Sequence, residues 1–123
     1  MDSPRNFIAA YLAAWNEEDV DRIADSYATP SFVVKGGQVL RQLDEVAKQG
    51  YFANLIADNA REGPHTWEIG GLDERRLGKN AALITVRWVA RRPDHTMIWD
   101  FLDSYLISAR DGRWHILGDV VHE

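Results

Sequence analysis

One acidic residue stands out among the side chains of this sequence that could do chemistry. Asp103 lies within Thr96 to Ser108, a run rich in β-branched and aromatic residues that is typical of a β-strand. Alternate residues of a strand share a face, so Asp103 should lie on the same face as Phe101 and Tyr105. Burial of an isolated carboxylate is costly, and this acid must therefore be hydrogen-bonded, ion-paired or protonated with a raised pKa. An acid in such an apolar setting is a candidate functional group.

Two turns predict which residues lie opposite this strand. Pro93-Asp94 and Asp111-Gly112 are turn sequences, and each is expected to join antiparallel neighbours. The expected pairs are Trp88 with Trp99, Val86 with Phe101 and Ile84 with Asp103 in one hairpin, and Ile107 with Ile116, Tyr105 with Gly118, Asp103 with Val120 and Phe101 with His122 in the other. Both hairpins then place their aromatic residues on one face, and Gly118 leaves space beside Tyr105.

Each candidate residue has a functional and a structural interpretation. Asp103 is either a functional acid or a structural ion-pair partner, with Arg75 as the candidate cation. His122 lies diagonal to Asp103 in the expected register, which makes it either part of an acid–base dyad or a terminal residue without a role. Trp88 and Trp99 either clamp a flat ligand or pack in the core.

The elements that position these residues can be read from caps, periodicity and turns. Ser3-Pro4 predicts a helix start, and apolar residues at helical spacing continue to Trp15. Asp19 is expected to cap a second, short helix that stops near Pro30. The remaining expected elements are two short strands at 31–35 and 38–41, a helix at 43–60, and four strands at 67–76, 81–92, 96–108 and 113–122. Helices followed by an antiparallel sheet predict an α+β fold in one domain, 1–123.

Composition excludes several classes of function. The chain has 123 residues, a formal net charge of −5 and no cysteine, which argues against a nucleic-acid partner, a thiolate nucleophile and a disulfide scaffold. No apolar run approaches the roughly 20 residues of a membrane span, and the amino terminus lacks the pattern of a secretory signal. We therefore expect a soluble, cytoplasmic protein. No metal site is expected, because His115 and His122 lie an odd number of residues apart on one strand.

The second face of the predicted sheet also carries apolar residues. Val89, Ile98, Leu102, Leu106, Leu117 and Val121 are interspersed there with charged and hydroxyl side chains. This mixture is too apolar for open solvent and too polar for a core, which is typical of a protein interface. For a small domain the simplest partner is a second copy of the chain, so a homodimer is expected.

Three segments of the sequence carry a family resemblance: the segment from Tyr11 to Asp21 (YLAAWNEEDVD), Tyr27-Ala28, and the segment from Ser108 to Ile116 (SARDGRWHI). In this order they resemble the NTF2-like superfamily, most closely the SnoaL-like and ketosteroid-isomerase-like small bacterial proteins. The resemblance implies a cone in which N-terminal helices pack on a curved antiparallel sheet around a cavity. It also implies dimerisation through the outer sheet face.

The resemblance implies roles for individual residues. Tyr11 matches the helical tyrosine of ketosteroid isomerases, and Asp103 matches their late-strand acid, which the apolar site of that enzyme keeps protonated. The general-base position falls on Lys35, or on Val34 in a shifted alignment, and neither is a carboxylate. The candidate catalytic residues are Asp103, Tyr11 and His122, and the candidate ligand-binding residues are Trp15, Tyr27, Phe32, Phe52, Trp88, Trp99, Phe101, Tyr105 and Val120.

Two functions remain open from the sequence. The first is an isomerase, cyclase or dehydratase for a small apolar or aromatic substrate, with Asp103 as acid or hydrogen-bond donor and no cofactor. The second is a non-catalytic module that binds a small ligand or a partner protein. The lone acid among aromatic residues favours the first function, whereas the missing carboxylate at Lys35 favours the second.

Overall fold

Each of the three α-helices starts at a side chain that accepts a hydrogen bond from a free backbone N–H. Ser3 Oγ accepts from Asn6, Asp19 accepts from the N–H of Arg22, and Asp44 accepts from that of Ala47. The caps predicted at Ser3 and Asp19 are confirmed. The computed structural model describes residues 2–123, and its helices are α1 (Pro4–Asn16), α2 (Val20–Asp25), α3 (Glu45–Asn59) and a short 3-10 turn at Ala60–Glu62.

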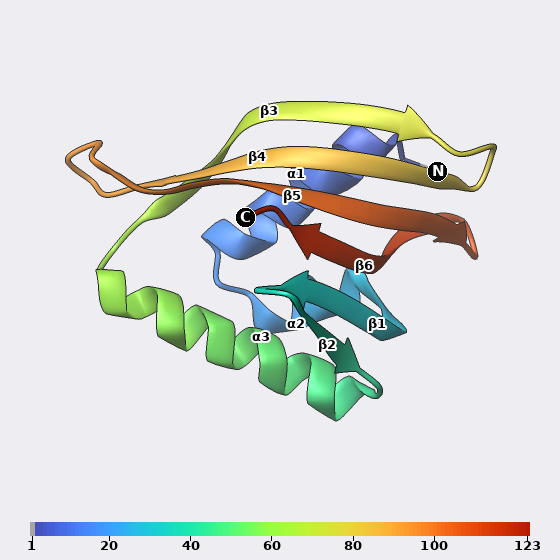
Figure 1. The fold of residues 1–123 in the computed structure, drawn as a ribbon, viewed down its shortest axis with the longest axis horizontal. Coiled ribbons are helices and arrows are strands. Elements are labelled where there is room, and N and C mark those ends of the chain that lie inside the picture. The colour runs from blue at the N-terminus through green and yellow to red at the C-terminus, as the bar shows by residue number, and fades with distance from the viewer. Residues whose placement is uncertain (1) are drawn as a thin grey trace.

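Six strands form one curved sheet. They are β1 (Tyr27–Lys35), β2 (Gln38–Gln42), β3 (Thr66–Arg76), β4 (Ala81–Arg91), β5 (Met97–Arg110) and β6 (Arg113–Val121), in the order β2-β1-β6-β5-β4-β3. All neighbours are antiparallel except β1 and β6, which are parallel. The hairpin and the four-strand meander expected from the sequence are thus joined into a single sheet. Figure 1 shows the long strands arching over the helices, with α3 along the lower side beside β2.

The hairpin of β4 and β5 has a register two residues from the expected one. Trp88 pairs with Phe101 instead of Trp99, and Val86 pairs with Asp103. The turn is longer than two residues, because the N–H of Arg92 bonds the carbonyl of Thr96. A shift of two residues leaves every side chain on its predicted face. The aromatic face of this hairpin therefore stands as predicted.

The hairpin of β5 and β6 begins in the predicted register and then changes. Ile107 pairs with Ile116 as expected, but the ladder shifts by one residue after Leu117, so Tyr105 pairs with Asp119 and not with Gly118. Because of this β-bulge, the residues that follow it in β6 lie on the opposite faces of the sheet from those predicted. The prediction that Val120 and His122 share a face with Asp103 is consequently wrong, and so is the prediction that Val121 lies on the outer face. Gly118 also leaves no space beside Tyr105.

The bulge leaves Gly118 in contact with β1 on the face away from the helices. A Cβ built at Gly118 would lie 2.3 Å from the ring of Phe32, so this ring can pack here only because residue 118 has no side chain. Phe32, Val120 and His122 thus belong to the outer part of the sheet. Their prediction as residues of the inner site rested on the unbulged register and is corrected here.

A buried lysine holds α3 against the start of β1. The side chain of Lys48 is 3% exposed. Its Nζ donates to the carbonyl of Tyr27 at 2.9 Å, to Thr29 Oγ1 at 3.0 Å and to Glu45 Oε1 at 3.2 Å. All three donors of the ammonium group have partners, which is the condition under which a buried charge is tolerated. The contact fixes the helix that forms one wall of the cavity described below.

We expect the cap of α3 to be worth a measurable part of the stability. Asp44→Ala removes the 2.8 Å bond to the N–H of Ala47 and should lower the free energy of unfolding by about 1 kcal/mol. Asp44→Ser is the matched control, since serine caps as well as aspartate and should retain most of that stability. Urea denaturation of the three proteins measures the difference. Equal loss in both variants would contradict the assignment.

Candidate functional site

A cavity of about 350 Å³ lies between the helices and the inner face of the sheet. It is lined mainly by aromatic side chains, with two acids and one lysine among them. The lining residues are Tyr11 and Trp15 from α1, Tyr27, Val33 and Lys35 from β1, Tyr51, Phe52, Leu55 and Asn59 from α3, and Trp67, Trp88, Trp99, Phe101, Asp103, Tyr105, Asp119 and Val121 from β3 to β6. A volume of this size suits a small organic molecule.

Most residues named from the sequence lie together in this cavity. Its wall contains, of the predicted catalytic residues, Asp103 and Tyr11, and, of the predicted binding residues, Trp15, Tyr27, Phe52, Trp88, Trp99, Phe101 and Tyr105. His122 lies elsewhere: it is exposed, and its Nε2 is 2.7 Å from Ser104 Oγ on the outer face. The expected His122–Asp103 dyad is therefore absent from the described structure.

A second acid, which sequence reasoning missed, lies next to Asp103. Asp119 is 3% exposed and Asp103 is 5% exposed. The two belong to adjacent strands and line the same cavity, because Asp119 pairs with Tyr105 and Asp103 pairs with Val121. Gly118 carried a signal for this arrangement, since a glycine inside a strand often marks a bulge.

The two acids differ in their hydrogen bonds. Tyr27 Oη donates to Asp119 Oδ1 at 2.8 Å. Asp103 Oδ1 is buried and has no hydrogen-bond partner among the described residues, 2–123. Within residues 2–123 no basic side chain forms an ion pair with either acid, so the predicted Asp103–Arg75 pair is not formed. An unpartnered buried oxygen is a group for which a ligand can provide the missing contact.

Burial raises the pKa values of both acids. For Asp103, desolvation is the largest cause and the nearby charge of Asp119 is the next, so the pKa of Asp103 lies well above its usual range. Burial also raises the pKa of Asp119, while its hydrogen bond with Asp103 and that from Tyr27 act in the opposite direction. The protein thus stabilises at least one of these carboxyl groups in its protonated form.

The tyrosines of the site are neutral donors and acceptors. Burial raises the pKa values of Tyr11, Tyr27 and Tyr105 well above the usual range, and it raises that of Tyr51 to about 12. Tyr11 Oη lies 3.2 Å from Tyr27 Oη, which connects α1 to Asp119 through a chain of hydroxyl groups. Tyr11 thus contacts the acids through Tyr27.

Three tryptophans, Trp67, Trp88 and Trp99, form part of the cavity wall. The rings of Trp67 and Trp99 are stacked, with centroids 5.4 Å apart and planes at 11°. The edge of Trp88 meets Trp67 at 6.2 Å, and Trp88 Nε1 donates to Tyr105 Oη at 2.9 Å. Trp99 is therefore covered by Trp67, and Trp88 and Trp99 do not form a clamp for a flat ligand.

The residue that places Trp67 comes from the end of α1. Asn16 donates its amide N–H to the carbonyl of Trp67 at 3.0 Å and accepts from the N–H of Trp67 at 2.8 Å. This two-bond contact ties the first helix to the start of β3. Asn16 thus has a structural role, because it positions Trp67 in the cavity wall.

The described chain offers no cluster for a metal. Residues 2–123 contain no group of three or more His, Cys, Asp or Glu side chains placed to hold a metal ion. His115 and His122 lie on the same, outer side of the sheet because of the bulge, so the sequence argument that they point to opposite faces is wrong. In the same part of the chain, no helix is both long and apolar enough to cross a membrane.

Comparison with known proteins places this architecture in a family. Residues 2–123 match the family described as NTF2-like protein (DUF6841), and the chain belongs to it. The predicted superfamily and the predicted α+β cone are thereby confirmed. The sequence matches no curated protein.

Solved structures with the same fold have low sequence identity. An NTF2-like protein of unknown function from Pseudomonas putida superposes with a TM-score of 0.77 at 17% identity, over 95% of this chain and 81% of that one. A proposed ketosteroid isomerase from Shewanella frigidimarina gives 0.71 at 18% identity, over 95% and 92%. A protein with a cystatin-like fold from Nostoc punctiforme gives 0.75 at 7% identity, over 95% and 85%. These likenesses show the fold alone.

The raised pKa values predict how stability depends on pH. A carboxyl whose pKa is higher in the folded state takes up protons on folding, so its contribution is present at low pH and is lost as the pH rises from about 4 through the folded-state pKa. The reference is the double variant Asp103→Asn/Asp119→Asn. As the pH rises, we expect the unfolding free energy of the wild type to fall relative to that of the double variant, by up to about 1.4 kcal/mol per pH unit for each proton taken up on folding.

Urea titrations of both proteins at several pH values between 5 and 9 measure this difference. The double variant removes both acids while keeping the side-chain shape. Parallel pH profiles for the two proteins would show that the acids are not perturbed by burial.

Proposed function

We propose that the cavity binds a small apolar or aromatic molecule and that Asp103 acts on it as a general acid or hydrogen-bond donor. The observation that carries this proposal is the unpartnered, buried Oδ1 of Asp103 in an aromatic cavity of about 350 Å³. A carboxylic acid kept neutral by burial can donate a hydrogen bond to a carbonyl or hydroxyl oxygen. Isomerisation, cyclisation and dehydration all use such a donor.

The aromatic walls determine which ligands fit. Trp15, Phe101 and the Trp67–Trp99 stack offer flat apolar surfaces, whereas polar groups concentrate around the two acids. A ligand with a planar or hydrocarbon body and one oxygen-bearing end satisfies both regions. Lys35 lines the same cavity and is exposed, so it can contact a polar substituent.

A non-catalytic binding module is the second candidate. It is favoured by the lysine at position 35, where the resemblance to ketosteroid isomerases calls for a carboxylate base. In this function Asp103 fixes the orientation of a ligand and no bond is changed. The two candidates share the cavity and differ in whether a bound molecule is converted.

We expect a ligand screen and one isosteric variant to separate these functions. Steroid-like ketones, polyketide-like compounds and aromatic acids are tested for an increase in melting temperature, because a ligand that binds the folded state stabilises it by mass action. Each binder is then incubated with the protein and its conversion is followed by chromatography. For a converted binder, Asp103→Asn should lower kcat by about 10²-fold or more while the protein still binds.

Asp73→Asn on β3 is the matched control, since Asp73 is exposed and does not line the cavity. Conversion that is equal in wild type and Asp103→Asn would remove Asp103 from the mechanism. Binding without conversion, altered in affinity by Asp103→Asn, would identify the non-catalytic module. A protein that none of the probes stabilises would contradict the proposed ligand class.

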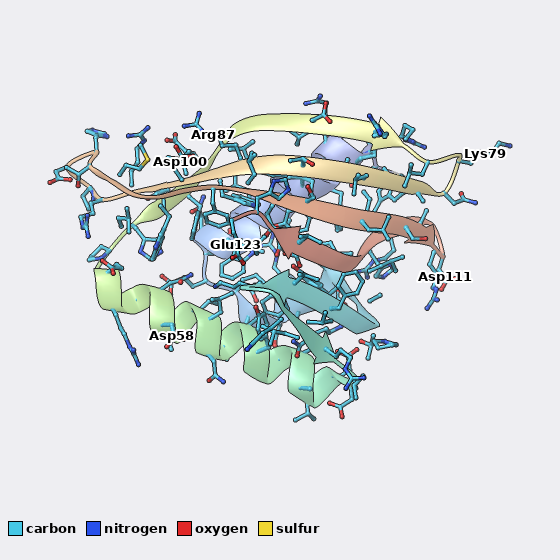
Figure 2. All side chains as sticks on the ribbon, viewed as in Figure 1. Asp58, Lys79, Arg87, Asp100, Asp111 and Glu123 are labelled. Atoms are coloured by element: carbon cyan, nitrogen blue, oxygen red, sulfur yellow. The ribbon has the colours of Figure 1, made fainter. Side chains whose placement is uncertain are left out.

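We also propose a homodimer formed through the outer face of the sheet. Leu102 and Val120 are 41% and 42% exposed in the single chain, and Phe32, Leu106 and Leu117 are half-buried around them. Arg87 and Asp100, labelled together in Figure 2, form a two-bond ion pair at 2.8 and 2.6 Å beside this surface. An apolar area with a paired polar edge fits a second copy of the same face.

The dimer is tested by light scattering coupled to size-exclusion chromatography. The wild type should elute with twice the chain mass. Leu102→Lys should give the single-chain mass, because it places a charge on each side of the symmetric contact. Lys79→Glu at the β3–β4 turn is the control: it also changes the net charge but lies away from the surface, so it should leave the mass doubled (Figure 2). A wild type of single-chain mass would refute the dimer. The cytoplasmic location stays a prediction.

A further inference from the structure

We propose that Asp103 and Asp119 form one functional unit that holds a single proton, with the proton on Asp103 and the negative charge on Asp119. Asp119 is then the proton acceptor of the site, because Tyr27 donates a hydrogen bond to it and stabilises its ionised form. The catalytic use of the pair rests on the proposed function. The shared proton itself does not, because it follows from how the two acids are placed.

The geometry limits the pair to one charge. Asp119 pairs with Tyr105 and Asp103 with Val121, so the two acids are diagonal neighbours on one face of adjacent strands. Both are at least 95% buried, and in residues 2–123 neither has an ion-pair partner. Two carboxylates that share such a site cannot both ionise without a large energetic cost.

Hydrogen bonding determines which acid is charged. Tyr27 Oη donates to Asp119 Oδ1 at 2.8 Å, and Tyr11 Oη, 3.2 Å from Tyr27 Oη, can donate to Tyr27 in turn. Donated bonds favour the ionised form of a carboxyl group. Among residues 2–123 Asp103 Oδ1 has no hydrogen-bond partner, and contact with Asp119 raises the pKa of Asp103 by more than contact with Tyr105 lowers it. A proton placed on Asp103 therefore leaves the charge where a donor already stabilises it.

The other groups that face the pair agree with this assignment. Tyr11 from α1, Tyr51 from α3 and Tyr105 from β5 are tyrosines whose pKa values are raised by burial, so they stay neutral. Lys35 from the end of β1 is the one basic residue among those that line the described cavity. Its positive charge favours ionisation of the pair, which is consistent with one negative charge and not with none.

A pair with one proton can move protons without a change in its own charge. With a substrate that carries an acidic C–H next to a carbonyl group, the C–H proton passes to Asp119, the C–H electron pair forms the carbon–carbon double bond, and Asp103 gives its proton to the carbonyl oxygen. The products of this step are a neutral enol, protonated Asp119 and ionised Asp103. Return of a proton from Asp119 to another carbon, and of the enol proton to Asp103, restores the pair.

The assignment explains how the site can lack a carboxylate at Lys35. Asp119 pairs with Val33 across the parallel β1–β6 contact, and Lys35 is the next residue of β1 that lines the cavity after Val33. An acceptor on β6 thus reaches the same space as one on β1. Tyr27 is a positioning residue in this scheme, since it acts on the proton transfer only through Asp119.

Carboxyl ¹³C NMR of the protein labelled at aspartate tests the pair without any ligand. The signals of Asp103 and Asp119 are assigned from Asp103→Asn and Asp119→Asn, and each is followed from pH 4 to pH 10. In the wild type, we expect Asp119 to be ionised and Asp103 to be protonated at pH 7. In Asp119→Asn, the midpoint for Asp103 should move down by about 1 pH unit or more, because the neighbouring charge is gone.

Tyr27→Phe tests the selecting role of the hydroxyl group. The ring keeps its packing but donates no bond to Asp119, so the midpoint for Asp119 should move up and that for Asp103 should move down. Asp73→Asn should leave both midpoints unchanged. A tyrosine with only a structural role would lower stability and leave the two midpoints where they were.

The outcomes separate this inference from the proposed function. Two acids that are both ionised at pH 7, a proton found on Asp119 instead of Asp103, or midpoints that Tyr27→Phe does not move would each overturn the pair as assigned, whether or not a ligand binds. A single proton on Asp103 that Tyr27→Phe redistributes supports the pair even if no probe in the ligand screen is converted. If a substrate is found, Asp119→Asn should lower kcat by about 10²-fold or more, and unchanged kcat would overturn the acceptor role.

Discussion

The cavity depends on one constraint: two neighbouring carboxyl groups are buried and form no ion pair within residues 2–123. Asp103 and Asp119 are at least 95% buried, and ionisation of both would place like charges side by side in a medium of low polarity. A hydrogen bond from Tyr27 stabilises the charge on Asp119, and apolar surroundings keep Asp103 neutral. The remaining fold must hold Tyr27 and β6 in place, and the buried ammonium group of Lys48 does so by bonding the carbonyl of Tyr27.

A one-residue insertion in β6 decides which residues face the cavity. The bulge at Leu117 turns Asp119 and Val121 inward and Val120 outward. Sequence periodicity placed the first half of the strand correctly, because Ile107 does pair with Ile116. It could not place the second half, since a change of one residue in register exchanges the two faces of a strand. The β4–β5 hairpin shows the contrast, because its register differed by two residues and its faces were still predicted correctly.

Local signals predicted the elements well, whereas non-local contacts were hidden. The caps at Ser3 and Asp19 are visible in the sequence because capping involves residues three positions apart. The parallel pairing of β1 with β6 joins residues that are far apart in the sequence, such as Val33 and Asp119, and no short-range pattern reports it. Trp67 joined the cavity for the same reason: its position depends on Asn16, which lies 51 residues away. Such contacts become visible only once the strands are arranged in space.

The position of a proton acceptor in this fold is less restricted than an alignment of strands suggests. A substrate in the cavity meets inward-facing side chains from both β1 and β6, which lie next to each other with Val33 opposite Asp119. A carboxylate on either strand can therefore reach the same part of a bound molecule. In the proposed pair, the lysine at position 35 does not remove acid–base chemistry from the site. It supplies a positive charge near an acceptor that has moved to the neighbouring strand, and that charge favours the ionised form the acceptor requires.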